Sequence, residues 1–394
     1  MKIALTCPAS LPATQFGGIM FLCIDLAKEL SKIGHDVSIY TTDMDFANNP
    51  KTFNRDLPRH EIIGKFKINR SHVWFSFGLF FVNPGMYFQM MKDNPDIIHA
   101  IGVRSFQSYI AALIAKKKKI PLVISDQGGL TTHPALIHGN IIKKLLYKIQ
   151  IPMIRFIINQ ATKVSVANEY EKQIFLDFCE DSKIVIVRNG VNLENINLNK
   201  FNFRKQYNIK ESFVLFLGRF DKVKGIDVLL NAINIIKDKP ALSNTKLVIM
   251  GVDFGFESQM LEMINEMKID DKVIVIKNPS REAVISAYQE SRFLVLPSRW
   301  ELSPLTPLEG FVFKKAVIST NTHGIPYTIK DGVHGILIES ENHKALADAI
   351  IELVSNEKKC QEYGLAGYNM IQTECNSVKM TENTLRIYQQ LVNG

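Results

Sequence analysis

The sequence predicts an α/β protein with two doubly wound parallel sheets, and three observations support this prediction. At 394 residues the chain is too long for one ordinary hydrophobic core, so we expect two domains. Short apolar runs typical of buried strands alternate with segments of helical periodicity in both halves. Strands separated by helices need crossover connections, which make each sheet parallel and cover both of its faces.

In the first half, a strand is expected at residues 2–6, and the glycine pair Gly17-Gly18 opens a helix that ends at Gly34. The same patterns continue toward the middle of the chain. Further strands are expected at residues 37–41, 97–100, 122–125, 163–167 and 184–187, with helices at 106–118 and 169–179.

The second half repeats this order, with strands expected at residues 213–217, 246–250, 273–276, 293–296 and 316–319. A polar, Asn-rich stretch at residues 194–210 is the predicted linker. We therefore expect one domain at residues 1–195 and a second at residues 205–375. Open α/β sheets bind ligands at the carboxyl ends of their strands, so we expect the site in a cleft between the two sheets.

Composition excludes several classes of protein. With 46% apolar and 22% charged residues, the chain is neither disordered nor fibrous. Its five cysteines are scattered without a C-x-x-C pair, which argues against a disulfide framework or a zinc site. The first residues lack a secretory signal, so a cytoplasmic protein is expected. There is no recognisable nucleic-acid-binding module, so no nucleic-acid partner is expected.

Two features bear on membranes. Residues 1–199 contain 23 Lys and Arg against 16 Asp and Glu, and the mixed basic and apolar runs at 116–119 and 143–155 suit either anionic lipid or a solvated helix face. Residues 71–91 contain seven aromatic side chains and no charge, but Asn83-Pro84-Gly85 divides them into pieces too short to span a bilayer. This segment is either a buried strand and helix, or an aromatic edge that meets a membrane or an apolar acceptor.

A basic loop follows the strand expected at residues 213–217. It contains Gly218-Arg219 and Lys224-Gly225 and precedes an apolar-periodic helix. Two cations beside the free N–H groups of a helix N-terminus can bind a phosphate without a metal. The loop is neither a P-loop nor a dinucleotide fingerprint.

An acidic pair follows the strand expected at residues 293–296. If Ser303 or Thr306 caps a helix, Glu301 lies on the loop and Glu309 lies inside that helix, where they can hold two hydroxyl groups of one ligand. Two structural interpretations stand beside this one. Thr306 to Glu309 also has the pattern of a capping box, and Arg299 can pair with Glu301.

Together these motifs resemble those of the GT-B glycosyltransferases of family 4, the retaining group 1 transferases. Six segments match in order over nearly the whole chain, and they are Gly17-Gly18, Val187-Arg188-Asn189-Gly190-Val191-Asn192, Gly218-Arg219 with Lys224-Gly225, Gly251, Glu301 with Glu309, and Asn321-Thr322-His323-Gly324-Ile325-Pro326. The resemblance implies the GT-B fold, with two Rossmann-like domains facing a cleft and a last helix, at residues 376–394, that packs back on the first domain.

The resemblance also implies roles for individual residues. Arg219 and Lys224 would neutralise the donor diphosphate, because departure of the nucleotide builds negative charge there and fixed cations stabilise it. Glu301 would hold the donor sugar, and Glu309 would bond the ribose. The other donor-binding residues implied are Gly17, Gly18, Gly251, Ser303 and Leu305. No metal and no other cofactor is expected.

The sequence departs from the family pattern at two positions. Gln127 stands where the family usually has a histidine, and Tyr327 stands where it has a glutamate. A glutamine bonds a sugar hydroxyl but does not shuttle protons. Either His133 from the following loop substitutes, or the reaction proceeds without such a group, or the protein only binds its ligand.

The motifs and the family resemblance together imply a retaining hexosyltransferase. The second domain would hold a nucleotide-sugar donor, and the first would hold a glycan or lipid-linked acceptor. The expected setting is polysaccharide or glycolipid biosynthesis in the cytoplasm, on the inner face of a membrane, with an anionic membrane surface as partner. A non-catalytic nucleotide-sugar-binding protein and a GT-B nucleotide-sugar epimerase are the alternatives.

Overall fold

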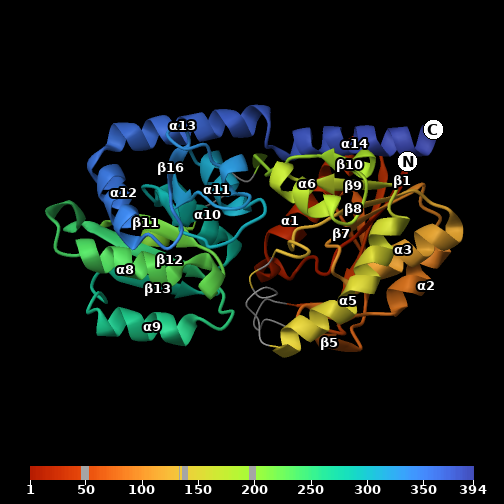
Figure 1. The fold of residues 1–394 in the computed structure, drawn as a ribbon, viewed down its shortest axis with the longest axis horizontal. Coiled ribbons are helices and arrows are strands. Elements are labelled where there is room, and N and C mark those ends of the chain that lie inside the picture. Colours follow the sequence, from red (N-terminus) through yellow and green to blue (C-terminus); the bar gives the residue numbers. More distant parts are fainter. Residues whose placement is uncertain (46–52, 133, 135–140, 195–200) are drawn as a thin grey trace. The chain divides into compact units, whose positions relative to one another are not determined.

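The computed structural model describes residues 1–45, 53–132, 134, 141–194 and 201–394, which divide into two α/β units (Figure 1). The first unit comprises Met1–Gly190 together with Asn376–Gly394, and the second comprises Val191–Cys375. Each unit is built on its own mainly parallel sheet, which confirms the predicted fold class.

The sheet of the first unit has the strand order β10-β9-β8-β7-β1-β2-β4-β3, and its neighbours are parallel except for the antiparallel pair β3 and β4. Its strands are β1 (Lys2–Thr6), β2 (Asp36–Thr42), β3 (His60–Ile63), β4 (Phe66–Ser71), β7 (Ile97–Ile101), β8 (Leu122–Ser125), β9 (Lys163–Val166) and β10 (Ile184–Ile186). Its main helices are α1 (Gly18–Lys32), α2 (Gly85–Lys92), α3 (Phe106–Lys118), α5 (Ile141–Gln160), α6 (Glu169–Leu176) and α14 (Ser377–Asn393). Every strand and helix expected in this half is present, and the pair β3–β4 was not predicted.

The uncharged segment 71–91 forms α2 and a small separate sheet of β5 (Phe75–Phe77) and β6 (Phe80–Val82). The first interpretation, a buried strand and helix, is correct for part of this segment, and several of its aromatic side chains are exposed. Phe81 is buried, with its ring centroid 6.3 Å from that of Phe16, whereas Trp74 and Phe77 are 71% and 68% exposed. Among the described residues, no helix is long and apolar enough to cross a membrane.

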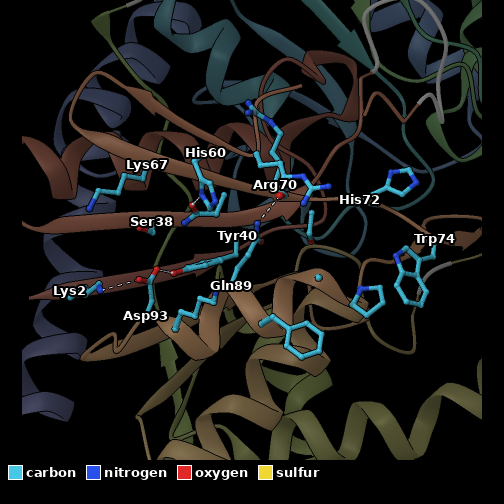
Figure 2. Close-up of a pocket in the computed structure, with 17 residues that line it drawn as sticks. Lys2, Ser38, Tyr40, His60, Lys67, Arg70, His72, Trp74, Gln89 and Asp93 are labelled. Carbon is cyan, nitrogen blue, oxygen red and sulfur yellow. Dashed lines mark hydrogen bonds and ion pairs between the residues drawn. The ribbon is translucent and has the colours of Figure 1, made fainter. Parts of the chain in front are cut away.

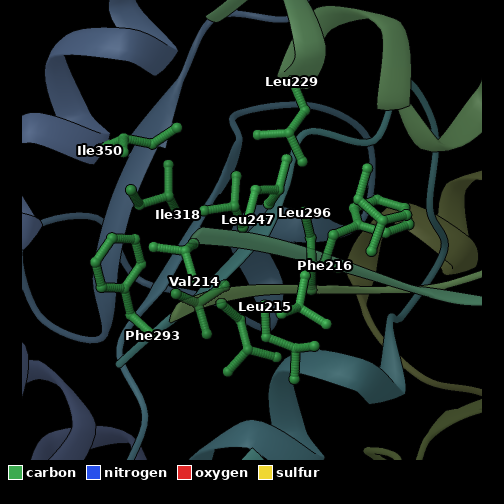
Figure 3. Close-up of a cluster of buried hydrophobic side chains, with 14 of the residues drawn as sticks. Val214, Leu215, Phe216, Leu229, Leu247, Phe293, Leu296, Ile318 and Ile350 are labelled. Carbon is green, nitrogen blue, oxygen red and sulfur yellow. The ribbon is translucent and has the colours of Figure 1, made fainter. Parts of the chain in front are cut away.

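The second unit has six parallel strands in the order β13-β12-β11-β14-β15-β16. They are β11 (Ser212–Leu217), β12 (Thr245–Gly251), β13 (Val273–Lys277), β14 (Leu294–Leu296), β15 (Val317–Thr320) and β16 (Gly335–Ile338). The helices are α7 (Phe203–Gln206), α8 (Ile226–Ile236), α9 (Glu257–Glu266), α10 (Arg281–Glu290), α11 (Leu305–Val312), α12 (His343–Ser355) and α13 (Glu357–Thr373). In Figure 3, Leu229 of α8 and Ile350 of α12 approach Val214 and its neighbours on β11. Helices cover both faces of this sheet, which is why β11 is a continuous apolar run.

The predicted linker at residues 194–210 is wrong at residues 201–210. Helix α7 lies there, and Phe203 is fully buried in the core of the second unit, with its ring centroid 5.5 Å from that of Phe213. The asparagines of this stretch suggested a polar connection, but Phe203 and Ile209 are buried in the core of the second unit, and Phe201 and Tyr207 pack against that core.

A buried histidine gives the first unit a pH-dependent stability. His99 on β7 is fully buried between Tyr388 of α14 (Nδ1 to Oη, 2.6 Å) and Ser125 (Nε2 to Oγ, 3.1 Å), and burial lowers its pKa to about 3. The unfolded chain takes up this proton near pH 6.5. Between pH 6.5 and pH 3 the free energy of unfolding therefore falls as the pH falls, by at most about 1.4 kcal/mol per pH unit from this group.

We expect H99Q to be less stable than the wild type at pH 7 but to lose less stability on acidification. Urea unfolding of both chains at pH 7 and pH 5 measures this difference. If H99Q and the wild type lost the same unfolding free energy between pH 7 and pH 5, His99 would not be the source of this pH dependence.

Candidate active site

Two loops of the second unit lie against each other at the carboxyl ends of β11 and β14. The basic loop after β11 ends at Gly225, which has φ +69° and begins α8. A Cβ atom at Gly225 would lie 2.0 Å from the carbonyl oxygen of Pro297, and the N–H of Arg299 donates to the carbonyl of Val223 at 2.8 Å. Only glycine allows this approach, so the backbone itself holds the two loops together.

This contact brings Lys224 and Glu301 together. The Nζ atom of Lys224 lies 2.5 Å from Oε1 of Glu301, and Ser298 Oγ donates to the same oxygen at 3.1 Å. The Glu301 carbonyl accepts from the N–H of Gly324 at 2.9 Å. Both side chains of the ion pair are partly exposed, so an incoming ligand can reach them.

Arg299 does not pair with Glu301, so that expectation is wrong. Its guanidinium binds both carboxylate oxygens of Asp227, at 2.7 and 2.9 Å, and it also pairs with Glu341. Arg299 reaches Asp227 because Asp227 lies in the first turn of α8, beside the loop that contains Arg299. This pairing leaves Glu301 to Lys224 and Ser298.

Arg219 and Gly251 complete the basic side of this region. The Arg219 guanidinium carbon lies 4.4 Å from the ring centroid of Phe254. Burial lowers the pKa of Arg219, while Asp221 and Glu301 act in the opposite direction, and the group stays a cation. A Cβ atom at Gly251 would lie 1.8 Å from the carbonyl oxygen of Gly218, so this glycine lets β12 pass close to the loop.

Glu309 is held by partners that the sequence did not reveal. Its Oε1 accepts from Arg281 Nη2 and its Oε2 from Tyr288 Oη, both at 2.8 Å. Burial first, and then Glu309, raise the pKa of Tyr288, so the phenol keeps its proton and donates. Each carboxylate oxygen still has a lone pair for a ligand hydroxyl.

The expected helix caps around Glu309 are wrong. Helix α11 begins at Leu305, its N-cap is Pro304, and no side chain of that residue accepts a cap hydrogen bond. Ser303 therefore lies before the cap and Thr306 lies inside the helix. Glu309 faces Arg281 and Tyr288 of α10 rather than the helix start, so no capping box forms.

The remaining candidate residues lie in the first unit. Gly17 is the N-cap of α1 with φ +110°, a conformation that glycine adopts without strain, and Gly18 is the first residue of that helix. Gln127 follows β8 and exchanges two hydrogen bonds with the amide of Asn189, both at 3.3 Å. In the sequence, Asn189 is visible only as part of the motif at residues 187–192, and nothing local indicates its pairing with Gln127. His133 lies outside the described residues.

The fold and these motifs define a glycosyltransferase of the GT-B class, and family models specify it further. Residues 199–370 match the glycosyl transferases group 1, and residues 16–195 match glycosyltransferase family 4. The chain belongs to this family of glycosyltransferases, as the sequence motifs predict.

Individual relatives share less than a third of their aligned residues with this chain. An uncharacterized glycosyltransferase of Methanocaldococcus jannaschii is 28% identical over 295 residues, which cover 70% of this chain and 72% of that protein. The capsular polysaccharide biosynthesis glycosyltransferase CapM of Staphylococcus aureus is 25% identical over 230 residues, 55% of this chain and 58% of that one.

Solved structures share the fold. Sucrose-phosphate synthase from Thermosynechococcus elongatus has a TM-score of 0.79 at 19% identity, with 99% of each chain covered. Anabaena Alr3699/HepE in complex with UDP-glucose has a TM-score of 0.75 at 14% identity, with 99% of this chain and 100% of that chain covered.

Proposed function

We propose that this glycosyltransferase is a retaining enzyme that moves a hexosyl group from a nucleoside-diphosphate sugar to a glycan or lipid-linked acceptor. The observation that supports it most is the pair Lys224–Glu301, 2.5 Å apart on two loops joined through their backbones, with Arg219 on the same basic loop. Cations suit the diphosphate, and a carboxylate suits a sugar hydroxyl. We assign the donor to the second unit and the acceptor to the first.

In this proposal the enzyme accelerates the reaction by stabilising the negative charge that develops on the leaving diphosphate. The acceptor oxygen bonds to C1 of the sugar on the face that the diphosphate leaves, and the electrons of the broken C1–O bond remain on the diphosphate. The acceptor proton passes to the departing phosphate oxygen. Arg219 and Lys224 stabilise that oxygen most when its charge is greatest, which lowers the barrier.

Two relatives guide the choice of substrates. One structural neighbour, Anabaena Alr3699/HepE, was solved in complex with UDP-glucose, and one relative is named for capsular polysaccharide biosynthesis. We therefore propose a UDP-sugar as donor and polysaccharide or glycolipid assembly as the setting, at the cytoplasmic face of a membrane.

The test is incubation of the whole chain with radiolabelled UDP-sugars and a membrane extract, with and without a chelator. We expect label in a glycan or lipid product with the anomeric configuration of the donor, and the same yield with chelator. Binding of the nucleotide sugar without product would favour the non-catalytic alternative, which the departure at Gln127 supports. A changed sugar on the nucleotide would favour an epimerase.

Gln127 is proposed to contact the donor sugar. One neutral hydrogen bond is worth about 1 kcal/mol, so we expect Q127A to lower kcat/KM roughly five- to tenfold. N189A removes only the partner that orients Gln127, and we expect a smaller loss, measured in the same transfer assay. Unchanged turnover and donor affinity in Q127A would exclude the contact.

A further inference from the structure

The first unit contains a groove with an excess of positive charge. It has a volume of about 680 Å³ and runs along the sheet beside α2 (Figure 2). Its cations are Lys2, Arg59, Lys67, Arg70 and Lys92, and its one carboxylate is that of Asp93. This balance suits an anionic ligand.

Part of this charge is available to such a ligand. Lys2 Nζ lies 3.3 Å from Asp93 Oδ1, and Lys67 Nζ lies 2.9 Å from Asp36 Oδ1, so these two lysines are paired. Arg59 and Lys92 are exposed, and no ion pair joins either of them to another described residue. Two unneutralised cations therefore line the same groove.

The groove is polar at one end and aromatic at the other. Figure 2 shows Lys2, Lys67 and Asp93 at one end and Trp74 at the opposite end. Phe88 also lines it, and the two aromatic side chains are 71% and 66% exposed. Soluble surfaces rarely expose large aromatic side chains together, so the aromatic lining of this groove suits an apolar partner.

The aromatic surface continues onto the β5–β6 hairpin. Phe75 and Phe77, two residues apart on β5, are 53% and 68% exposed, with ring centroids 5.8 Å apart. The base of the hairpin is anchored, because Trp74 N–H donates to the Val82 carbonyl at 2.8 Å and Gln107 Nε2 donates to the Phe81 carbonyl at 3.0 Å. The fold therefore holds these rings outward.

We propose that this surface binds an anionic phospholipid of a membrane. The phosphate lies in the groove near Arg59 and Lys92, and the acyl chains meet Trp74, Phe75 and Phe77. Inorganic phosphate would not use the aromatic residues, whereas a lipid matches both ends. The inference deepens the membrane setting of the proposed function, and it places the contact outside the Lys224–Glu301 site.

Tryptophan fluorescence gives a local readout, because the chain has two tryptophans, Trp74 and the buried Trp300. With vesicles of phosphatidylglycerol and phosphatidylcholine, we expect a blue shift that is absent with phosphatidylcholine alone and absent in W74F. A shift of equal size with neutral vesicles, or its persistence in W74F, would overturn the proposal.

Vesicle co-sedimentation separates the two halves of the surface. We expect R59S/K92S and F75S/F77S each to weaken binding roughly tenfold or more, with the first double variant also losing most of the salt dependence. The control L261S/L365S removes two exposed apolar side chains of the second unit and should bind like the wild type. Equal binding by all four chains would refute the proposal, as would saturation of the groove by inorganic phosphate or a soluble protein in place of lipid.

The outcome is distinguishable from failure of the proposed function. Loss of vesicle binding with intact glycosyl transfer to a soluble acceptor would overturn this inference alone. Vesicle binding without any transfer would overturn the proposed reaction alone.

Discussion

Replacing Lys224 with alanine is expected to lower kcat/KM by roughly 10²- to 10³-fold, the loss typical of removing one preorganised group that stabilises transition-state charge. The reason is its position, because Lys224 Nζ is fixed 2.5 Å from Glu301 Oε1 by a loop that Gly225 and Arg299 hold against its neighbour. A mobile surface lysine would lose conformational entropy on reaching the transition state, whereas the side chain of Lys224 is already ordered in the folded protein. Transfer assays with the UDP-sugar donor measure the loss.

The matched control is K222A. Lys222 lies two residues earlier on the same loop and is exposed, and its side chain has no partner among the described residues. Removing it changes the net charge of the protein by the same amount as K224A. We expect a loss of no more than a few-fold, from weaker long-range attraction. Equal losses in the two variants would show that the loop acts only through its total charge.

Folding must be checked in K224A, because among the described residues the substitution leaves the Glu301 carboxylate with Ser298 as its side-chain hydrogen-bond partner. The pair is partly exposed, so we expect its removal to cost about 1 kcal/mol or less of unfolding free energy. A thermal midpoint close to that of the wild type would assign the lost activity to chemistry rather than to stability.

The strands of both sheets could be predicted because their burial leaves a simple signature. Parallel strands covered on both faces are short apolar runs, as Phe213 to Phe216 illustrate. The pair β3–β4 was missed because β4 includes Lys67, Asn69 and Arg70, which break the run, although Arg70 is 2% exposed and its Nη2 donates to Glu61 at 2.6 Å. A buried charge that is neutralised by a partner on the neighbouring strand breaks the apolar run that would otherwise indicate a strand.

Within the candidate site, the sequence predicted the chemistry of each loop but not the contacts between loops. The residue types and spacing around Lys224 and Glu301 indicated anion and hydroxyl binding, but their pairing depends on the contact of Gly225 with Pro297, which joins segments about 70 residues apart. The partners of Glu309 come from another helix, and nothing in the local sequence distinguishes Arg281 from an ordinary surface arginine. The sequence therefore indicated which side chains can bind a ligand, but it did not indicate which residue each of those side chains contacts in the fold.

E301Q should separate donor binding from transfer. Glutamine keeps the shape of Glu301 and can still accept from Ser298 Oγ, but it no longer neutralises Lys224. The lysine is then free for the diphosphate, so we expect UDP to bind as tightly as in the wild type or more tightly. Turnover should fall roughly 10²- to 10³-fold, because the carboxylate that we propose positions the sugar has lost its charge.

The double variant K224A/E301Q makes this prediction sharper. Two residues that act on one donor molecule are strongly non-additive, so the double variant should lose little more activity than the worse single variant. UDP affinity should then fall to that of K224A, because the gain in E301Q depends on a lysine that is no longer present. Calorimetric titration with UDP measures the affinities, and transfer assays measure the turnover. If E301Q lost UDP affinity in proportion to its turnover, Glu301 would be holding the loop in place instead of the sugar.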